Sequence, residues 1–593
     1  MDNIFSVLNR RWQVKEGDEK LSLFLEQRLN VPPTIARLLS SRGFSNPEET
    51  QEFLNPTLKS SLPNPSIFKD MEKAILRLEK ALLKNETIVL YGDYDVDGAT
   101  SSALFKKFFD ALGASVRLYI PDRIKEGYGP NTHAFESFFK DGIKLILTLD
   151  SGTTAFEALS YAHEKLMDVI VIDHHISELK LPLAYALINP NRSDESEHIK
   201  QNYGNLAAVG VSFLTLVALN RRLREQNFYE TRFIKEPDLR QFLDLVALGT
   251  VADVVPLTGL NRTFVAQGLK IMKKRTNIGL KALADIAKIT ESPEAYHAGF
   301  ILGPRINAGG RVGESSLGAH LLSTECLKEA QMISEKLHHL NQSRQEMENK
   351  MLSDALFKIE AHLKENPLPA ALIVADETWH PGIIGIIAGR LKDRYDRPAC
   401  VIALKDGIGK ASGRSLPIVN LGKLIHQAKD LNLLINGGGH AMAAGFTIEE
   451  SKIKEFESFL TEQIAQTLKE TNYKPTLHID GKLSLAALTL DFLKILEQMA
   501  PFGMGNPTPR FMVPCLRITN TSLIQNTHVR CTLRSEEGIK LDAIAFRAFN
   551  TPLGDALMDA KNHPFHFVGT FRRDSWNGRE KIQMTIEDLA PIS

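Results

Sequence analysis

Three short apolar segments that each lead into an aspartate constrain the fold of this chain more than any other feature. They are Thr87–Tyr91, Ile143–Leu149 and Asp168–Ile172, and helical patterns separate them. Two further strands are predicted at Val116–Ile120 and Tyr185–Ile188. Apolar strands that alternate with helices predict a parallel sheet covered on both faces. Because ligands bind beyond the carboxyl ends of such strands, we expect the aspartates to contribute to a site there.

The chain of 593 residues is too long for one hydrophobic core, and its pattern changes several times. A mostly helical region comes first, followed by the parallel-sheet region and a charged helical stretch without glycine or proline. A smaller α/β pattern and a module of short alternating strands follow, and a barrel of the OB type is expected for that module. The predicted boundaries are 1–85, 86–325, 326–366, 367–471 and 472–593.

The composition is that of an ordinary globular protein. It indicates the cellular compartment of the protein more than its function. Lysine plus arginine equals aspartate plus glutamate, at 71 each, so composition alone does not indicate nucleic-acid binding. Four scattered cysteines without a CxxC pair argue against disulfides or structural zinc and favour a reducing cytoplasm. No stretch approaches the roughly 18 apolar residues of a membrane span, and the start does not resemble a signal peptide. We therefore expect a cytoplasmic protein with no membrane partner.

The segment Gly92–Gly98 carries three alternating aspartates, Asp93, Asp95 and Asp97, directly after a predicted strand. In an extended segment, this alternation aims all three side chains the same way. Carboxylates this close repel one another unless a cation lies among them, and oxygen ligands suit Mg²⁺ or Mn²⁺. A solvated acidic turn and a calcium loop are the alternatives. An EF-hand loop needs a later glutamate, and none occurs before Asp110.

Three other places offer metal-ligand side chains. Asp150 follows an apolar strand, where it can be either a ligand or a helix N-cap. Asp173, His174 and His175 follow another strand, and two adjacent histidines there are less ordinary than one structural histidine. His174 can bind a metal as a neutral imidazole, Asp173 can orient a ring, and His175 can donate to a phosphoryl oxygen. Asp253 lies in an apolar run, so its buried carboxylate should be paired or coordinated.

Taken in order, these motifs resemble those of the DHH phosphoesterase family, and aspartate rather than histidine at position 93 resembles its RecJ branch. The resemblance implies two divalent ions, Mn²⁺ or Mg²⁺, with Asp150 between them, held by Asp93, Asp95, Asp97, Asp150, His174 and Asp253. The implied catalytic residues are Asp150, His174, His175 and Asp253. Two such ions activate water for an in-line displacement, so no serine or cysteine nucleophile is needed. Walker A and GxSxG sequences, which ATPases and serine hydrolases use, are absent.

Several basic residues lie in glycine-rich segments that match the same family. Arginine forks bind phosphate and glycine lets backbone amides approach it, although turn chemistry with surface arginines explains each segment equally well. The stretch Gly437–Gly445 resembles the DHHA1 domain that accompanies DHH catalytic domains. The resemblance implies a 5′-phosphate pocket formed by Arg123, Ser412 and Arg414. The other residues expected to contact substrate phosphates are Arg305, Arg311 and His440.

The C-terminal module resembles the RecJ OB-type domain, which begins here at Pro501–Pro507. Such a domain binds single strands through a basic groove and stacking aromatics. Phe511, Phe546 and Phe549 are either these stacking residues or ordinary core residues. In the stretch GPRINAGGR (303–311), the glycine pair 309–310 stands where many relatives carry alanine before glycine, and this departure is expected to loosen the loop slightly.

The resemblance extends from about residue 40 to the end and implies an α/β multidomain fold. Its parts are a parallel-sheet DHH domain, a long connecting helix, a smaller α/β DHHA1 domain and a C-terminal OB-type β-barrel. The implied activity is a 5′-3′ exonuclease that hydrolyses single-stranded DNA to 5′-mononucleotides in DNA repair and recombination. The expected partners are single-stranded DNA, a single-strand-binding protein and a helicase, and the expected state is a monomer.

Two other functions stay open. A short-oligonucleotide or cyclic-dinucleotide phosphodiesterase of the same family would share the metal site, but those chains are usually shorter and lack the C-terminal β module. A non-catalytic DHH-fold DNA-binding scaffold is expected to have lost metal ligands, and all six are present here.

Overall fold

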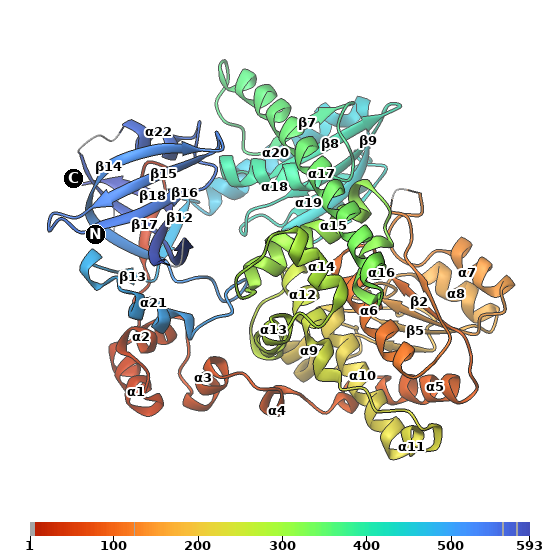
Figure 1. Ribbon diagram of the computed structural model, residues 1–593. Helices are drawn as coiled ribbons and strands as arrows, with labels where there is room; N and C mark the ends of the chain where they lie inside the picture. The colour runs from red at the N-terminus through yellow and green to blue at the C-terminus, as the bar shows by residue number, and fades with distance from the viewer. Residues whose placement is uncertain (1–5, 124, 560–562, 577–578, 593) are drawn as a thin grey trace. The chain divides into compact units, whose positions relative to one another are not determined.

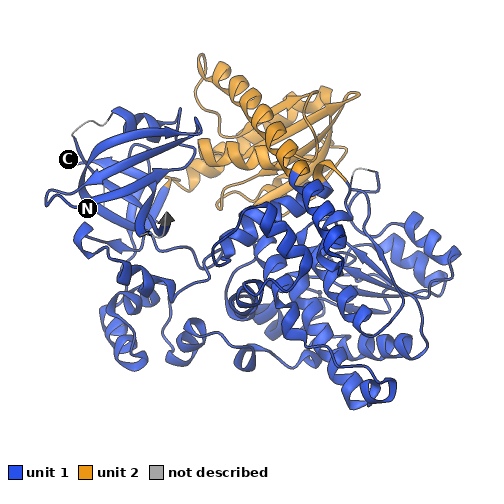
Figure 2. Ribbon diagram, in the orientation of Figure 1, with its two compact units in different colours: residues 1–310, 314–338, 476–593 blue, residues 311–313, 339–475 orange. Residues whose placement is uncertain are grey.

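The structure, a computed structural model, describes residues 6–123, 125–559, 563–576 and 579–592. The chain forms two compact units (Figure 2), of residues 1–310, 314–338 and 476–593 and of residues 311–313 and 339–475. Helix α17 (Leu327–Leu363) begins in the first unit and ends in the second, which confirms the long connecting helix.

A five-stranded parallel sheet forms the centre of the first unit, with strand order β3-β2-β4-β5-β6. Its strands are β2 (Ile88–Gly92), β3 (Val116–Tyr119), β4 (Leu145–Leu149), β5 (Asp168–Ile172) and β6 (Ala186–Ile188). All five predicted strands are therefore confirmed. Every residue of β2 and β4 is buried, which is why the sequence shows continuous apolar runs there.

Helices lie on both sides of this sheet (Figure 1). On one face, α7 (Thr132–Lys140) and α8 (Phe156–Glu164) pack Phe138 and Leu159 against Ile146. On the other side lie α6 (Val96–Ala111) and α10 (Ala208–Glu225). The remaining helices around the sheet are α5 (Met71–Leu83), α9 (Glu197–Tyr203), α11 (Phe228–Arg232), η2 (Leu239–Phe242), α12 (Leu243–Ala252), α13 (Gly259–Met272), α14 (Ile278–Ile286), the π-helix η3 (His297–Leu302), α15 (Gly303–Val312) and α16 (Leu317–Ser323).

The second unit contains a mixed five-stranded sheet of order β10-β11-β9-β8-β7, in which β7 and β8 are parallel and the other neighbours antiparallel. Its elements are β7 (Leu372–Asp376), α18 (Ile384–Tyr395), β8 (Ala399–Lys405), β9 (Ile408–Arg414), α19 (Leu421–Asp430), β10 (Asn436–Gly439), β11 (Ala443–Glu449), η4 (Glu450–Lys452) and α20 (Ile453–Glu470). The second α/β pattern is confirmed, and the glycine-rich stretch Gly437–Gly445 lies in the β10–β11 hairpin.

The C-terminal strands form a barrel, because the ladder β14-β15-β16-β18-β17 is closed by the pairing of β17 with β14. This confirms the OB-type module. Its elements are β12 (Thr476–Ile479), β13 (Gly481–Lys482), η5 (Leu485–Ala487), α21 (Leu490–Glu497), β14 (Phe511–Ile524), β15 (His528–Arg534), β16 (Lys540–Ala545), α22 (Pro552–Asp559), β17 (Pro564–Trp576) and β18 (Arg579–Pro591).

The N-terminal segment completes the core of this barrel. Strand β1 (Arg11–Val14) pairs with β12, and Ile35, Leu39 and Phe53 share a hydrophobic core with Leu516 and Phe567. The other N-terminal elements are α1 (Glu19–Leu29), α2 (Pro33–Ser41), α3 (Pro47–Leu54), α4 (Leu58–Ser61) and η1 (Pro65–Ile67).

A buried arginine on α13, Arg262, joins three segments of the first unit. It is 1% exposed, and its Nε donates to the carbonyl of Phe53 in α3 (2.6 Å). Its Nη atoms donate to the carbonyls of Met499 (3.0 Å), Ala500 (2.8 Å) and Pro501 (3.2 Å). Burial lowers the pKa of Arg262 to about 10, so the guanidinium stays charged at neutral pH. Helices near the sheet, the N-terminal helices and the segment before the barrel thus share one anchor.

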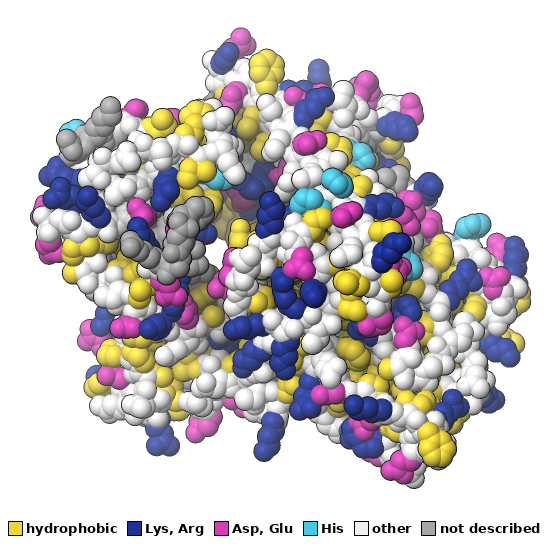
Figure 3. Space-filling view, in the orientation of Figure 1, with side chains coloured by type: hydrophobic (Ala, Val, Ile, Leu, Met, Phe, Trp, Pro, Cys, Tyr) yellow, Lys and Arg dark blue, Asp and Glu magenta, His cyan; other side chains and the backbone are white. Residues whose placement is uncertain are grey.

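The surface carries both signs of charge, and basic and acidic side chains are intermixed on the face in Figure 3. Within the described ranges, no single helix is long and apolar enough to cross a membrane. The bent pair α9 and α10 passes that test by length and composition only.

Candidate metal centre

The first three aspartates lie where β2 passes into α6. The Asp93 amide donates to the carbonyl of Leu149 at the end of the neighbouring strand (3.1 Å). Asp95 is the N-cap of α6, and its carboxylate accepts from the amides of Asp97 (2.9 Å) and Gly98 (3.1 Å). The prediction of one extended segment is wrong, because Asp97 belongs to the first helical turn. A Cβ at Gly98 would lie 2.4 Å from the Asp93 carbonyl oxygen, so this tight turn requires glycine.

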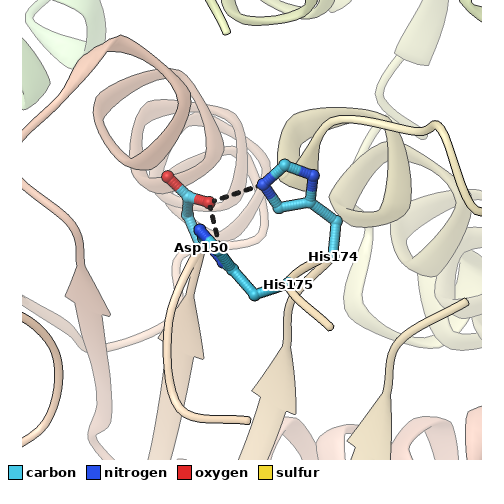
Figure 4. A group of neighbouring side chains, drawn as sticks. All are labelled: Asp150, His174 and His175. Carbon is cyan, nitrogen blue, oxygen red and sulfur yellow. Dashed lines mark ion pairs between the residues drawn. The ribbon is translucent and has the colours of Figure 1, made fainter. Parts of the chain in front are cut away.

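Asp150 follows β4 in the left-handed backbone region, with a φ of 63°. Its amide donates to the carbonyl of Ile172 (3.0 Å), which continues the pairing of β4 with β5 beyond the strand ends. The N-cap alternative for Asp150 is wrong, because α8 begins at Phe156 with Ala155 as its N-cap. The Asp150 side chain is buried and faces the two histidines in Figure 4.

Asp173 organises the histidine pair that follows β5. Its Oδ1 accepts from the amides of His174 (2.7 Å) and His175 (3.2 Å). The same oxygen lies 2.7 Å from Nδ1 of His175, and Oδ2 accepts from the amide of Thr153 (3.0 Å). Asp173 therefore orients the His175 ring, as an acceptor behind the histidine.

Two asparagines that the sequence reasoning missed hold the backbone of the same turn. Asn189 Nδ2 donates to the carbonyl of His175 (2.8 Å), and Asn191 Nδ2 donates to the carbonyl of His174 (2.6 Å). The signal was present, since Asn189-Pro-Asn191 directly follows the strand β6.

The side chains from these places meet in one cluster, and Figure 4 shows three of its members, Asp150, His174 and His175. His174 Nε2 lies 3.3 Å from Asp150 Oδ1 and 3.7 Å from Asp253 Oδ2. The same nitrogen lies 4.0 Å from Asp97 Oδ2. Three groups have donor atoms within 4.8 Å of one another: Asp93, Asp95 and Asp150; Asp97, His174 and Asp253; Asp150, His174 and His175. Asp150 and His174 each belong to two of these groups.

Burial and mutual repulsion raise the pKa values of the clustered carboxyl groups. Burial, then the charge of Asp97, raises the pKa of Asp253 to about 9. Burial, then the charge of Asp95, raises the pKa of Asp97 to about 7. The pKa of Asp150 is also raised, first by burial and then by Asp97. Burial lowers the pKa of His174 to about 4, so its imidazole is neutral and can act as a ligand.

The unsatisfied oxygens indicate what the cluster needs. Oδ1 of Asp93, Oδ1 of Asp150 and Oδ2 of Asp253 are buried and have no hydrogen-bond partner among the residues that the structure describes. Buried carboxylates without partners are unfavourable, and a divalent cation supplies the missing charge and contacts. Carboxylate oxygens with a neutral imidazole suit Mn²⁺ and Mg²⁺. The donor set therefore fits two such ions.

Backbone amides at the start of helix α10 hold the carboxylate of Asp97. Its Oδ2 accepts from the amide of Ala208 (2.6 Å) and its Oδ1 from the amide of Val209 (2.8 Å), both in the first turn of α10. A carboxylate at a helix N-terminus is stabilised by the amides and by the helix dipole. This contact links the aspartate turn to the helix that follows the histidine segment.

The segment GPRINAGGR is helical, so the prediction of a loop loosened by Gly309 and Gly310 is wrong. Both glycines lie buried in α15. A Cβ at Gly310 would lie 2.8 Å from the carbonyl oxygen of Tyr94, so glycine lets α15 pack directly on the aspartate turn. Close packing, rather than flexibility, explains the glycines.

Three family descriptions match consecutive parts of the chain. They are the DHH family, N-terminal domain, at residues 87–250, the DHHA1 domain at 369–466 and the RecJ OB domain at 479–588. The single-stranded-DNA-specific exonuclease RecJ of Escherichia coli (strain K12) is 34% identical over 588 residues, which cover 98% of each chain. This chain belongs to the RecJ family.

Other RecJ proteins are similar over nearly the whole length of the chain. The RecJ exonuclease of Bacillus subtilis (strain 168) is 34% identical over 98% of this chain and 71% of that protein. The crystal structure of RecJ from Thermus thermophilus in complex with Mn²⁺ has a TM-score of 0.80 and 28% identity. It covers 98% of this chain and 80% of that chain. The predicted fold class is confirmed by these matches.

Two of the arginines expected to contact substrate lie in the first unit of this RecJ-family chain. The Arg123 guanidinium lies 5.0 Å from the centre of the Tyr94 ring, beside the aspartate turn. Arg305 Nη1 donates to the carbonyl of Ile301 (2.6 Å), and its Nε lies 3.3 Å from His338 Nδ1. Arg305 therefore binds the end of the π-helix that precedes it.

The other expected substrate residues lie in the second unit. Ser412 and Arg414 are two residues apart on β9, and Arg414 Nη1 donates to Ser412 Oγ (3.1 Å). A Cβ at Gly385 would lie 3.0 Å from Ser412 Oγ and 3.1 Å from Arg414 Nη2, so the start of α18 packs against this pair. Arg311 donates to a backbone carbonyl (3.1 Å), and His440 is exposed in the β10–β11 hairpin.

Of the three phenylalanines that could stack on bases, only one has an open ring. Phe511 is 3% exposed in the barrel core, so a stacking role for it is wrong, and Phe549 is half-buried. Phe546 is 45% exposed, with the Arg572 guanidinium 5.3 Å from its ring centre and the His528 ring at 5.3 Å. Phe546 therefore keeps the geometry of a stacking residue.

Proposed function

We propose that this chain hydrolyses single-stranded DNA from the 5′ end to 5′-mononucleotides, with two divalent ions, Mn²⁺ or Mg²⁺, as cofactors. The observation that carries this function is the cluster in which two ligand groups share Asp150. The naming of its relatives as single-stranded-DNA-specific exonucleases supports the substrate. The same names favour an exonuclease over a short-oligonucleotide or cyclic-dinucleotide phosphodiesterase or a non-catalytic scaffold. The proposed role of this activity is in DNA repair and recombination.

The residue roles follow from the chemistry of each side chain. Two divalent ions supply activated water and positive charge for an in-line displacement at phosphorus. The proposed ligands are Asp93, Asp95, Asp97, Asp150, His174 and Asp253. Burial lowers the pKa of His175, but its hydrogen bond with Asp173 outweighs burial and raises that pKa to about 9. His175 therefore carries a proton at neutral pH and can donate it to a phosphoryl oxygen.

Recognition of the 5′ end is assigned to Arg123, Ser412 and Arg414. Arginine beside a hydroxyl gives a fork of donors that matches a terminal phosphate. Burial lowers the pKa of Arg414, which indicates a guanidinium held out of water and available for an anion. The remaining contacts to phosphates along the strand are assigned to Arg305, Arg311 and His440.

The wider assignments rest on the sequence pattern. The proposed domains are an N-terminal region (1–85), a DHH domain (86–325), a connecting helix (326–366), a DHHA1 domain (367–471) and an OB-type domain (472–593). The four cysteines are all free, which is in keeping with a cytoplasmic location. The proposed state is a monomer, and the proposed partners are single-stranded DNA, a single-strand-binding protein and a helicase.

One assay tests the catalytic proposal. Single strands and duplexes labelled at the 5′ or the 3′ end are incubated with Mn²⁺ or Mg²⁺, and early release of a labelled mononucleotide is expected only from 5′-labelled single strands. Asp150→Asn should abolish release, since asparagine tolerates the left-handed backbone but removes the shared charge. Asp110→Asn, an exposed carboxylate paired with Lys106, is the control and should keep wild-type activity. Retained hydrolysis by Asp150→Asn contradicts the assignment.

A second variant tests polarity. Arg414→Ala should reduce cleavage of 5′-phosphorylated strands about 10-fold or more while changing 5′-hydroxyl strands less. The exposed Arg240→Ala serves as a matched control. An equal loss on both kinds of end argues against a 5′-phosphate pocket at this position.

A further inference from the structure

Two aromatic rings on the surface of the first unit stack on each other and remain open to solvent. Tyr296 is 56% and Phe300 is 74% exposed. Their ring centres are 5.4 Å apart with an interplanar angle of 25°. Large apolar side chains are seldom exposed as a contiguous pair without a binding role. Phe300 lies in η3, and π-helical turns are rare and occur frequently at functional sites.

Buried residues on the opposite side of η3 hold the backbone that carries the two rings. Ala298 and Leu302 on the opposite face of η3 are buried. The buried His297 accepts the amide hydrogen of Glu294 at Nδ1 (3.0 Å) and pairs with Glu291 through Nε2 (3.0 Å). The rings are therefore held in place on a rigid support, which reduces the entropy lost when a planar ligand stacks on them.

The segment that carries the pair packs on a helix that leads into the metal cluster. A Cβ at Gly299 would lie 3.2 Å from Val251 Cγ1, so η3 packs directly on the last turn of α12. Asp253, a proposed metal ligand, is the C-cap of that helix. Val254, the next residue, is 65% exposed, so the chain reaches the protein surface directly after this ligand.

A residue of the same segment interacts with an arginine of the barrel. Glu294, two residues before Tyr296, interacts electrostatically with Arg572. Arg572 in turn lies over the ring of Phe546, which is exposed on the barrel. Exposed aromatic rings together with arginines are a kind of surface that single-stranded nucleic acids use, because every base has a face that can stack.

We propose that Tyr296 and Phe300 form a platform on which a nucleobase of the single-stranded DNA substrate stacks while the strand is bound at the metal cluster. This inference rests on the proposed nuclease function. The occupant is a base rather than a protein segment, because the helix η3 that carries Phe300 packs on the helix that ends at a proposed metal ligand. The platform positions the strand and takes no part in bond cleavage.

Binding of DNA with single missing bases tests the platform. The probe is a 5′-phosphorylated oligothymidylate of about 12 nucleotides, bound in Mn²⁺ by the inactive Asp150→Asn background and followed by fluorescence anisotropy. Adding Tyr296→Ala and Phe300→Ala together should raise Kd by between about fivefold and a hundredfold. An abasic residue at one position should weaken binding to the parent by a similar factor and leave the doubly substituted protein unaffected. Tyr296→Phe with Phe300→Tyr should restore parent behaviour.

Controls separate this proposal from the catalytic one. In the active background, the double alanine variant should raise KM for the oligonucleotide by a larger factor than it lowers kcat, because the platform positions the strand and takes no part in bond cleavage. Phe233→Ala, an exposed phenylalanine at the end of α11, should change neither. An unchanged Kd and an unchanged abasic profile overturn the platform while the nuclease proposal stands. So does a wild-type dimer that the double variant converts to a monomer without loss of DNA affinity. Absence of any hydrolysis by the wild type overturns the nuclease proposal instead.

Discussion

Replacing Asp173 by asparagine should weaken both the fold and the activity, and the size of the effect follows from four hydrogen bonds. The amide oxygen of asparagine can keep the contacts of Oδ1 with the backbone of His174 and His175. Its NH₂ group then stands where Oδ2 accepts from Thr153, so two donors face each other at 3.0 Å. The opposite rotamer is worse, because it turns the NH₂ toward two backbone donors.

The magnitude comes from the lost charge and the orphaned donor. A buried donor without a partner is unfavourable by about 1–3 kcal/mol, and bonds to a charged acceptor contribute about 1.5–3 kcal/mol each. Since the neutral amide keeps part of the Oδ1 contacts, Asp173→Asn should lower the free energy of unfolding by about 3–5 kcal/mol. The pKa of His175 should fall as well, because its hydrogen bond with Asp173 is what opposes burial. Activity should fall about 10- to 100-fold, as for other groups that orient metal-site histidines.

Urea denaturation gives the stability change, kcat/KM on a 5′-phosphorylated oligonucleotide gives the activity, and the NMR titration of the His175 ring gives its pKa. Glu178→Gln is the matched control, an exposed carboxylate in the same loop. A loss of less than about 1 kcal/mol with an unchanged His175 pKa would refute the reasoning, since ordinary surface changes produce effects of that size.

Two further predictions concern buried charges outside the cluster. Arg262→Met should destabilise the fold by about 2–4 kcal/mol in urea denaturation, because the carbonyls of Phe53 and Ala500 lose their donor while Asn506 still serves Met499 and Pro501. Arg240→Met, at an exposed site, should have no effect beyond about 0.5 kcal/mol, and an equal effect of both would contradict the anchoring role. Burial raises the pKa of Asp244 to about 7, so the folded chain binds a proton that the unfolded chain has lost, and stability falls as pH rises from about 4 to 7. Asp244→Asn should remove this fall, so its free energy of unfolding should exceed that of the wild type by at most about 4 kcal/mol at pH 8 and should equal it near pH 4. A gain that does not depend on pH would exclude titration of Asp244 as its cause.

The parallel sheet could be predicted because burial on both faces leaves each strand a continuous apolar run, as in β4. The metal cluster followed from the sheet. Residues directly after neighbouring parallel strands, such as Asp150 and Asp173, must come together at one edge.

Local geometry could not be predicted where hydrogen bonds or packing decide between equal patterns. The spacing of Asp93, Asp95 and Asp97 fits a strand as well as a helix start, and only the capping bonds of Asp95 settle it. The glycine pair 309–310 indicates a turn by propensity, but contact with Tyr94 makes it helical. Tertiary contacts of this kind leave no mark at short range in the sequence.

The exposure of side chains to solvent could not be predicted from the sequence either. Tyr296 and Phe300 are four residues apart, a spacing that is typical of a buried helix face, and only the fold shows that their rings are open. The hydrogen bond from the Thr153 amide to Asp173 joins residues 20 positions apart, so no local sequence motif predicts it.

The contact of Gly310 with Tyr94 limits how this sequence can be redesigned. A methyl group at position 310 would stand 2.8 Å from a carbonyl oxygen, closer than such atoms come in folded proteins. Either α15 or the aspartate turn would have to yield, and the turn cannot shift without carrying Asp93 and Asp95 away from Asp150. Replacing a helical glycine by alanine usually stabilises a helix, but at this position it would displace residues of the metal cluster. Consensus schemes that exchange helical glycines should therefore leave Gly310 unchanged.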